Sequence, residues 1–209
     1  SNDGSLLNFY KKGIKTFGID PILLKYRLNY KKINYKVADF FSAKKIINKT
    51  KKKFKIITAL SVFYDSEDPN IFIRDVKKIL SKNGVFLLEF ADLASIIKYK
   101  MFDTICHEHL EYYSSKVIIN LCEENNLRVF DININDINGA SKQYYICHDK
   151  SKFKSNSRKI NKILQFEKKL KLTKESTFKK FFKIIKKSKV ELNNFLRKAK
   201  KLRKKIHGY

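Results

Sequence analysis

The sequence has few cysteines and no long apolar run. Its three cysteines, Cys106, Cys122 and Cys147, are scattered along the chain and form no CxxC pair. This pattern argues against a disulfide framework and against a zinc site built by the chain itself, and it fits a reducing cytoplasm. No apolar stretch approaches the ~18 residues that a membrane-spanning helix needs, so we expect no membrane partner. The opening residues, SNDGSLLNFYKKG, lack the basic and apolar regions of a signal peptide.

Acidic residues become scarce after about residue 150. Residues 150–209 contain 23 lysines and arginines but three acidic residues, whereas residues 1–149 contain 24 and 17. The net charge of +27 is therefore concentrated in the tail, where it is spread along helical faces. Lys, Asn, Ile, Phe and Tyr are all abundant and all have A/T-rich codons, so composition explains the charge without a polyanionic partner. Because no base-stacking or groove-reading motif accompanies it, we expect no nucleic-acid partner. An RNA-modifying or RNA-binding protein stays open as an alternative.

The first 148 residues alternate β-rich runs with helical patterns, which predicts an α/β domain with a mostly parallel sheet. The expected strands are residues 15–20, 35–40, 54–61 and 85–90, closed by 128–133 and 143–148. The expected helices are residues 6–12, 21–30, 43–48, 69–80 and 116–126. Lys82–Asn83–Gly84 is expected to stop the fourth helix, and Asn138–Gly139 predicts a hairpin turn between the two closing strands. We assign residues 1–149 to this domain.

Residues 150–209 have a different, helical character. Residues 157–170 and 173–202 predict two helices, and the second carries an apolar stripe at i, i+3, i+4 spacing from Phe178 to Leu202. We expect this stripe to pack against a neighbouring element. The final residues, KIHGY at 205–209, resemble the beginning of a new strand.

Polar groups that could hold a cofactor follow successive expected strands. The loop Asn2–Asp3–Gly4 precedes the first helix, where glycine permits a tight turn and free N–H groups are available, although an ordinary helix cap explains it equally. Asp20 ends the strand at residues 15–20 and is placed to accept the ribose hydroxyls. This loop has one glycine rather than the three of a dinucleotide fingerprint, which favours an adenosyl cofactor.

Two further groups extend this cofactor site. Asp39, at the end of the strand at residues 35–40, could accept a hydrogen bond from an adenine amino group while Phe40 packs on the base. A turn-forming role for Asp39 is the alternative. Ser61, which ends the strand at residues 54–61, is also assigned to the cofactor.

The densest group of reactive side chains is FDTICHEHLEYY at residues 102–113. His107 and His109 are not arranged as HExxH, and neighbours at i and i+2 cannot share one helix face, so we expect no metal site. A histidine pair flanked by Glu108 suits proton abstraction instead, because imidazole titrates near neutral pH and a carboxylate can orient it. A polar loop without catalytic function is the alternative.

Six segments resemble, in order and spacing, the C-methyltransferase family that acts on nucleotide-linked deoxysugars and related metabolites. They are SNDGSLL, FGIDP, ADFF, SVFYDSEDPN, FDTICHEHLEYYS and NGAS. The resemblance covers residues 1–148 and continues weakly through the tail, and FDTICHEHLEYYS is its most specific segment. It implies a class I (Rossmann-like) methyltransferase fold that binds S-adenosyl-L-methionine. Family members carry an N-terminal zinc-binding domain and a further C-terminal domain. The resemblance therefore implies that zinc belongs only to a domain absent from this chain. It also implies that the first strand is missing and that residues 150–209 begin a C-terminal domain.

The resemblance also implies roles for single residues. It places Asn2, Asp3 and Gly4 at the methionine end of the cofactor, Asp20 at the ribose, and Asp39 and Phe40 at the adenine. It makes His109 the general base that deprotonates a carbon next to a ketone, with Glu108 and His107 beside it. Tyr112, Asn138 and Gly139 are expected near the sugar.

Three residues depart from the family pattern. Cys106 replaces a tyrosine, while Ala140 and Lys142 replace a glycine and an arginine, a change expected to alter contacts to a phosphate. An O- or N-methyltransferase for another small molecule therefore stays open. No N/D-P-P-F/Y motif follows Ser61, which argues against N-methylation of nucleic acid.

Overall fold

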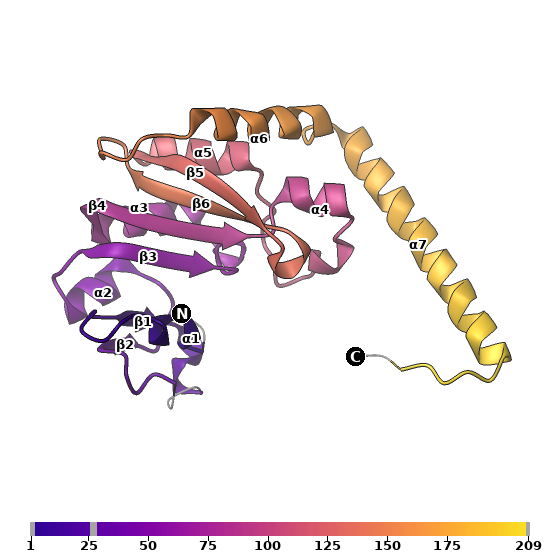
Figure 1. Ribbon diagram of the computed structural model, residues 1–209, viewed down its shortest axis with the longest axis horizontal. Coiled ribbons are helices and arrows are strands. Elements are labelled where there is room, and N and C mark those ends of the chain that lie inside the picture. The colour runs from indigo at the N-terminus through magenta and orange to yellow at the C-terminus, as the bar shows by residue number, and fades with distance from the viewer. Residues whose placement is uncertain (1–2, 26–28, 208–209) are drawn as a thin grey trace.

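The computed structural model describes residues 3–25 and 29–207 (Figure 1). Two sheets make up its β structure. β1 (Phe17–Ile19) and β2 (Tyr35–Val37) form a parallel pair. The larger sheet has the strand order β3-β4-β6-β5 and is not hydrogen-bonded to that pair within the described residues. The expectation of a further strand ahead of residue 1 stays a prediction.

The larger sheet combines parallel and antiparallel pairs. β3 (Phe54–Leu60) and β4 (Leu80–Phe90) are parallel, whereas β5 (Leu127–Asn135) and β6 (Ser141–His148) form the antiparallel hairpin expected at the end of the domain. β6 also pairs with β4, so the hairpin extends the sheet beyond its parallel half. This strand–helix alternation ending in a hairpin confirms the predicted α/β fold class.

Helices lie beside both sheets and continue into the tail (Figure 1). They are α1 (Ser5–Asn8), α2 (Ala43–Lys49), α3 (Pro69–Ile79), α4 (Leu93–Tyr99), α5 (Ser115–Glu124), α6 (Ser157–Leu170) and α7 (Glu175–Lys201). Short 3-10 turns lie at η1 (Pro21–Leu24), η2 (Phe63–Asp65), η3 (Phe102–Thr104) and η4 (Ile137–Gly139). None of the described helices combines the length and apolar character that crossing a membrane requires.

Local sequence signals explain where α3 begins and ends. The Asp68 carboxylate accepts a hydrogen bond from Ile71 N at 2.9 Å, and Pro69 occupies the first helical position. The helix ends at Ile79, but the expected stop at Lys82–Asn83–Gly84 is wrong because these residues already belong to β4. β4 pairs with β3 on both sides of this segment, at Leu80 and again from Val85, and the register shifts between the two.

The predicted length of the helix at residues 21–30 is also wrong, because the described helical segment is shorter. The described part is the four-residue turn η1, which begins where the Asp20 side chain accepts a hydrogen bond from Ile22 N. By contrast, the predicted turn at Asn138–Gly139 is confirmed. Both residues adopt positive φ angles, 53° and 85°, which Asn and Gly tolerate best and which reverse the chain between β5 and β6.

The core lies on the larger sheet and beneath α3, α5 and α6. Phe86, Leu88 and Phe90 of β4 are fully buried and belong to one apolar cluster with Ile118 of α5 and Ile163 of α6. The first part of the tail is therefore packed onto the same core as the sheet, and its packing positions the loops at the carboxyl ends of the strands.

A buried charge cluster fixes the same elements together. Lys142 Nζ of β6 lies 2.7 Å from an Asp92 oxygen and 3.1 Å from a Glu167 oxygen of α6, and it donates to Ser115 Oγ at 2.9 Å. Asp92 accepts from backbone N–H groups at the start of α4, and Glu167 accepts from Ser115 N and Lys116 N at the start of α5. The Lys142 side chain is 3% exposed, and the expectation that the replacements at Ala140 and Lys142 alter contacts to a phosphate stays a prediction.

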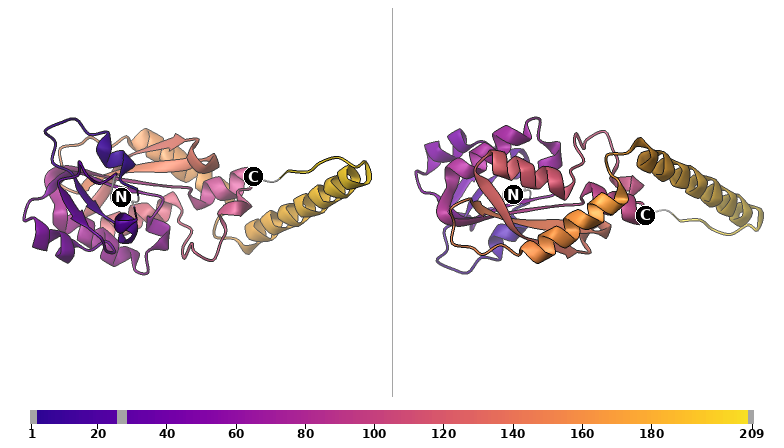
Figure 2. Two further views of the ribbon diagram at one scale, coloured as in Figure 1. Left: turned by 90° about the horizontal axis from the view of Figure 1, so that it is seen from below. Right: turned by 90° about the horizontal axis from the view of Figure 1, so that it is seen from above.

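The apolar stripe of α7 packs against the rest of the protein only near the N-terminal end of the helix. Phe181 is buried and, with Ile185, lies in a cluster with Ile96 of α4 and Met101. Figures 1 and 2 show the rest of α7 projecting away from the sheets, where Phe195 is 68% exposed. The expected packing of the stripe is therefore confirmed only at the N-terminal end of α7.

Candidate active site

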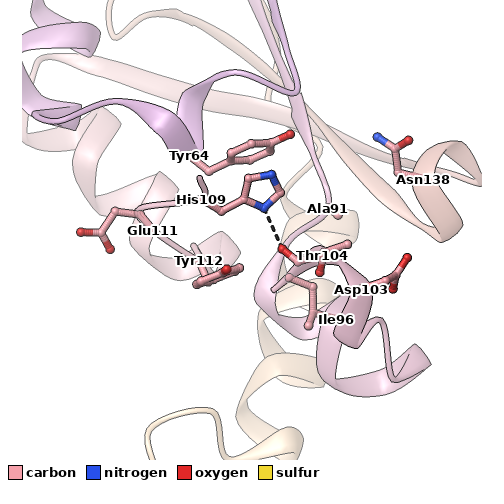
Figure 3. A pocket seen from close by; sticks show the side chains of 9 residues that line it. All are labelled: Tyr64, Ala91, Ile96, Asp103, Thr104, His109, Glu111, Tyr112 and Asn138. Carbon is pink, nitrogen blue, oxygen red and sulfur yellow. Dashed lines mark hydrogen bonds between the residues drawn. The ribbon is translucent and has the colours of Figure 1, made fainter. Parts of the chain in front are cut away.

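A cavity of about 280 Å³ opens where the loops after β3, β4 and β5 converge (Figure 3). η2 follows β3, α4 and η3 follow β4, and η4 connects β5 to β6. The side chains of this site come from these segments and from the loop before α5. The lining residues are Tyr64, Ala91, Ile96, Asp103, Thr104, His109, Glu111, Tyr112 and Asn138. Three of them, His109, Tyr112 and Asn138, were predicted as site residues.

One ring nitrogen of His109 makes a hydrogen bond within the protein, which leaves the other nitrogen available to accept a proton. Its Nδ1 lies 2.7 Å from the Thr104 carbonyl oxygen, as the dashed line in Figure 3 shows. A carbonyl oxygen can only accept, so Nδ1 carries the proton in the neutral ring. Nε2 then has a lone pair that can accept a proton. This is the arrangement that a general base requires.

Tyr64 supports His109 through both its ring and its backbone. The two ring centroids are 4.1 Å apart and the planes are tilted by 45°. The Tyr64 carbonyl oxygen accepts from Leu110 N at 3.1 Å and Glu111 N at 3.2 Å, which fixes the chain directly after the histidine. Burial is the main cause that raises the pKa of the Tyr64 phenol, and a hydrogen bond with the Ser61 side chain acts in the opposite direction. Sequence reasoning did not assign Tyr64, because its contact with His109 joins residues that are far apart in the sequence.

The polar groups of Tyr112 and Asn138 line the cavity, and each already makes hydrogen bonds within the protein. The Tyr112 hydroxyl accepts from Cys106 N at 3.3 Å and donates to the Cys106 carbonyl oxygen at 3.4 Å. Asn138 Nδ2 donates to Ser61 Oγ at 3.4 Å, which joins η4 to the end of β3. Gly139 does not line the cavity; a Cβ at this position would contact the Met101 side chain.

His107 and Glu108 do not line the cavity. Both are exposed in a turn closed by a hydrogen bond from His109 N to the Cys106 carbonyl oxygen at 3.3 Å. Asp65 lies near this turn: burial raises the pKa of its carboxyl, His109 lowers it and Glu108 raises it. The catalytic roles assigned to His107 and Glu108 stay predictions.

The carboxylates expected to bind the cofactor follow the two strands of the smaller sheet. Because β1 and β2 are parallel, Asp20 and Asp39 lie at the same edge of that pair. An Asp39 oxygen is 2.6 Å from Lys45 Nζ, and this contact, together with the N–H of Phe40, lowers the pKa of Asp39. The Phe40 ring is 73% exposed. None of these residues lines the cavity, and their cofactor roles stay predictions.

The first loop has the conformation expected of a tight turn. Gly4 has a φ angle of 79°, and a Cβ there would lie 2.9 Å from the Tyr30 ring. Asp3 accepts hydrogen bonds from Ser5 Oγ and Ser5 N, which lower the pKa of its carboxyl. Asn2, which was assigned to the same loop, lies outside the described residues.

A metal site is not formed by the described part of the chain. Within it, no group of three or more His, Cys, Asp or Glu side chains is placed to hold an ion. Cys106, Cys122 and Cys147 are all unpaired, and the last two are buried.

Two family models match consecutive parts of the chain. Residues 1–132 match the methyltransferase domain, and residues 136–209 match the C-methyltransferase C-terminal domain. A curated relative, the C-methyltransferase NovU of Streptomyces niveus, is 31% identical over 87 residues, which are 42% of this chain and 21% of that protein. The chain therefore matches about a fifth of the length of this relative.

Solved structures support the fold. A LepI variant in complex with SAH and a substrate analogue has a TM-score of 0.53 at 7% identity, covering 70% of this chain and 40% of that one. The Haloferax volcanii complex between the Trm112 methyltransferase activator and a candidate methyltransferase gives 0.53 at 13% identity, covering 70% and 79%. At these identities the likeness concerns the fold alone.

Proposed function

The chain belongs to the methyltransferase-domain family, and we propose that it transfers a methyl group from S-adenosylmethionine to a carbon atom. The acceptor is a carbon next to a ketone in a nucleotide-linked deoxysugar or a similar small metabolite. One observation carries the proposal: His109 Nδ1 is bound to the Thr104 carbonyl oxygen, so that Nε2 is the basic atom at a cavity of about 280 Å³. The match of residues 136–209 to the C-methyltransferase C-terminal domain supports carbon as the acceptor.

The residues after β1 and β2 fit an adenosyl group. The Asp20 and Asp39 carboxylates can accept from ribose hydroxyls and from an adenine amino group, and the exposed Phe40 ring offers a stacking surface. Gly4 has a positive φ angle, and a Cβ there would meet the Tyr30 ring, so this tight turn requires glycine. We infer that the turn holds the methionine end of the cofactor. S-adenosylmethionine supplies an electrophilic methyl on a sulfonium. The zinc expected in family members belongs to a domain outside this chain.

The chain's own residues supply the base and the orientation. His109 Nε2 takes the proton from the carbon next to the ketone, and the Thr104 carbonyl stabilises the imidazolium because it accepts from Nδ1–H. Tyr112 and Asn138 form the walls that orient the substrate. With three unpaired cysteines, we place the protein in a reducing cytoplasm, without a nucleic-acid or membrane partner.

His109→Asn tests this proposal. Asparagine cannot act as a base near neutral pH, so we expect methyl transfer to a keto-sugar nucleotide to fall by about 10²–10⁴-fold. Affinity for S-adenosylhomocysteine, measured by calorimetry, should stay unchanged. His107→Asn is the matched control, because His107 is two residues away but exposed outside the cavity, and it should retain most of the activity. Full activity in His109→Asn, or a product methylated on oxygen, would overturn the proposal.

A further inference from the structure

Deprotonation next to a ketone leaves negative charge on the carbonyl oxygen, which needs a hydrogen-bond donor in the cavity. Most donors that line the cavity already have a protein acceptor. Thr104 Oγ1 donates to the Met101 carbonyl oxygen at 2.7 Å, and His109 Nδ1 donates to Thr104. The Tyr112 hydroxyl donates to the Cys106 carbonyl oxygen at 3.4 Å.

The remaining side chains that line the cavity reduce the number of candidate hydrogen-bond donors further. Asp103 and Glu111 are carboxylates, and the cavity-lining set of the described residues contains no lysine or arginine. Asn138 uses one amide proton on Ser61 Oγ at 3.4 Å. A hydrogen bond with the Ser61 side chain lowers the pKa of the Tyr64 phenol. A serine hydroxyl can donate as well as accept, so Ser61 can donate to the phenol oxygen and leave the phenol's own proton for a ligand in the cavity that Tyr64 lines.

Tyr64 also lies where such a donor must be. Its ring is in contact with the imidazole of His109, with centroids 4.1 Å apart. Figure 3 shows the phenol oxygen and the unbonded ring nitrogen of His109 pointing to the same side of the site. One carbonyl group could thus present its oxygen to Tyr64 and its neighbouring C–H bond to His109.

We propose that Tyr64 is a second catalytic residue, whose hydroxyl donates a hydrogen bond to the substrate carbonyl oxygen during proton removal. The inference rests on the proposed carbon methylation. The C–H electron pair becomes the new C=C bond, the carbonyl π pair moves to the oxygen, and the proton goes to His109 Nε2. The Tyr64 O–H bond stays intact and stabilises the enolate oxygen. Burial raises the pKa of this phenol, so the hydroxyl is protonated throughout the neutral range.

Tyr64→Phe tests the inference because it keeps the ring against His109 and removes only the hydroxyl. Loss of one oxyanion donor should lower kcat by about 10²-fold, with little change in KM for a keto-sugar nucleotide. Exchange of the substrate's α-hydrogen in deuterated water, with S-adenosylhomocysteine bound, should fall in parallel. The melting temperature should stay close to that of wild type. Tyr99→Phe is the control, since Tyr99 is half exposed on α4 and lies outside the cavity, and its exchange rate should be unchanged.

Two outcomes would overturn the inference, and they distinguish a failure of the role of Tyr64 from a failure of the proposed function. If wild type forms a carbon-methylated product and Tyr64→Phe keeps its kcat and exchange rate, Tyr64 is not catalytic although the proposed function stands. If wild type methylates oxygen and exchanges no α-hydrogen, the proposed function is wrong and the role of Tyr64 is wrong with it.

Discussion

Replacing Lys142 by methionine should remove the positive charge that joins β6 to α4, α5 and α6. The Lys142 ammonium contacts Asp92 at 2.7 Å and Glu167 at 3.1 Å, and the three side chains are 3%, 0% and 6% exposed. Methionine fills nearly the same volume, so the change is mainly electrostatic. It leaves two carboxylates in the interior without a counter-ion.

The structure indicates the size of the effect. Breaking a buried ion pair by removing one partner typically costs about 3–5 kcal/mol. Asp92 and Glu167 each keep two backbone N–H donors at the starts of α4 and α5, so we expect about 3 kcal/mol, near the lower end. That is a large part of the ~5–15 kcal/mol by which domains are stable.

Urea unfolding followed by circular dichroism measures this loss. Lys179→Met is the matched control, because Lys179 pairs with Glu175 at 3.0 Å but both side chains are more than two-thirds exposed. It should cost less than about 0.5 kcal/mol. Adding Glu167→Gln to Lys142→Met should recover part of the loss by removing one uncompensated charge. A loss below about 1 kcal/mol in Lys142→Met would refute the reasoning, since it would mean that the buried charges need no partner.

Two further predictions concern the cofactor and the alkaline limit of stability. Asp20→Ala should weaken S-adenosylmethionine binding by about 1.5–3 kcal/mol in calorimetry, the cost of losing charged hydrogen bonds, and unchanged affinity would remove Asp20 from the site. Burial raises the pKa of Tyr113 to about 12, and its hydroxyl has no hydrogen-bond partner among the described residues. The phenol therefore ionises first in the unfolded chain, and stability should fall as pH rises from about 10 to 12. Tyr113→Phe should reduce this fall in urea titrations; an identical pH dependence in the two proteins would contradict the assignment.

Periodicity and capping signals were sufficient to predict those elements whose structure is decided by residues close together in the sequence. α6 spans the predicted residues 157–170, α3 begins at the predicted Pro69, and the Asn138–Gly139 turn lies between the expected strands. These elements are set by local caps, apolar spacing and residues that tolerate positive φ angles. His109 was found for a similar reason, because its neighbours form an unusual motif.

Contacts between residues far apart in the sequence were not predictable in this way. Lys142 is 25 residues from Glu167 and 50 from Asp92, and nothing in its local sequence shows that it is buried between them. Tyr64 meets His109 only after β3 and β4 have paired, so its place at the cavity required the structure. The stripe of α7 has the period of a packed helix, but period alone does not identify what covers it.

The central claim is that His109 removes a proton from carbon before the methyl group is transferred. Its most direct test is NMR of a keto-sugar nucleotide incubated in deuterated water with the protein and S-adenosylhomocysteine, which cannot donate a methyl group. The account predicts that deuterium enters the position next to the ketone with wild type and does not enter with His109→Asn. Turnover with S-adenosylmethionine but no such exchange in wild type, or equal exchange in His109→Asn, would contradict it.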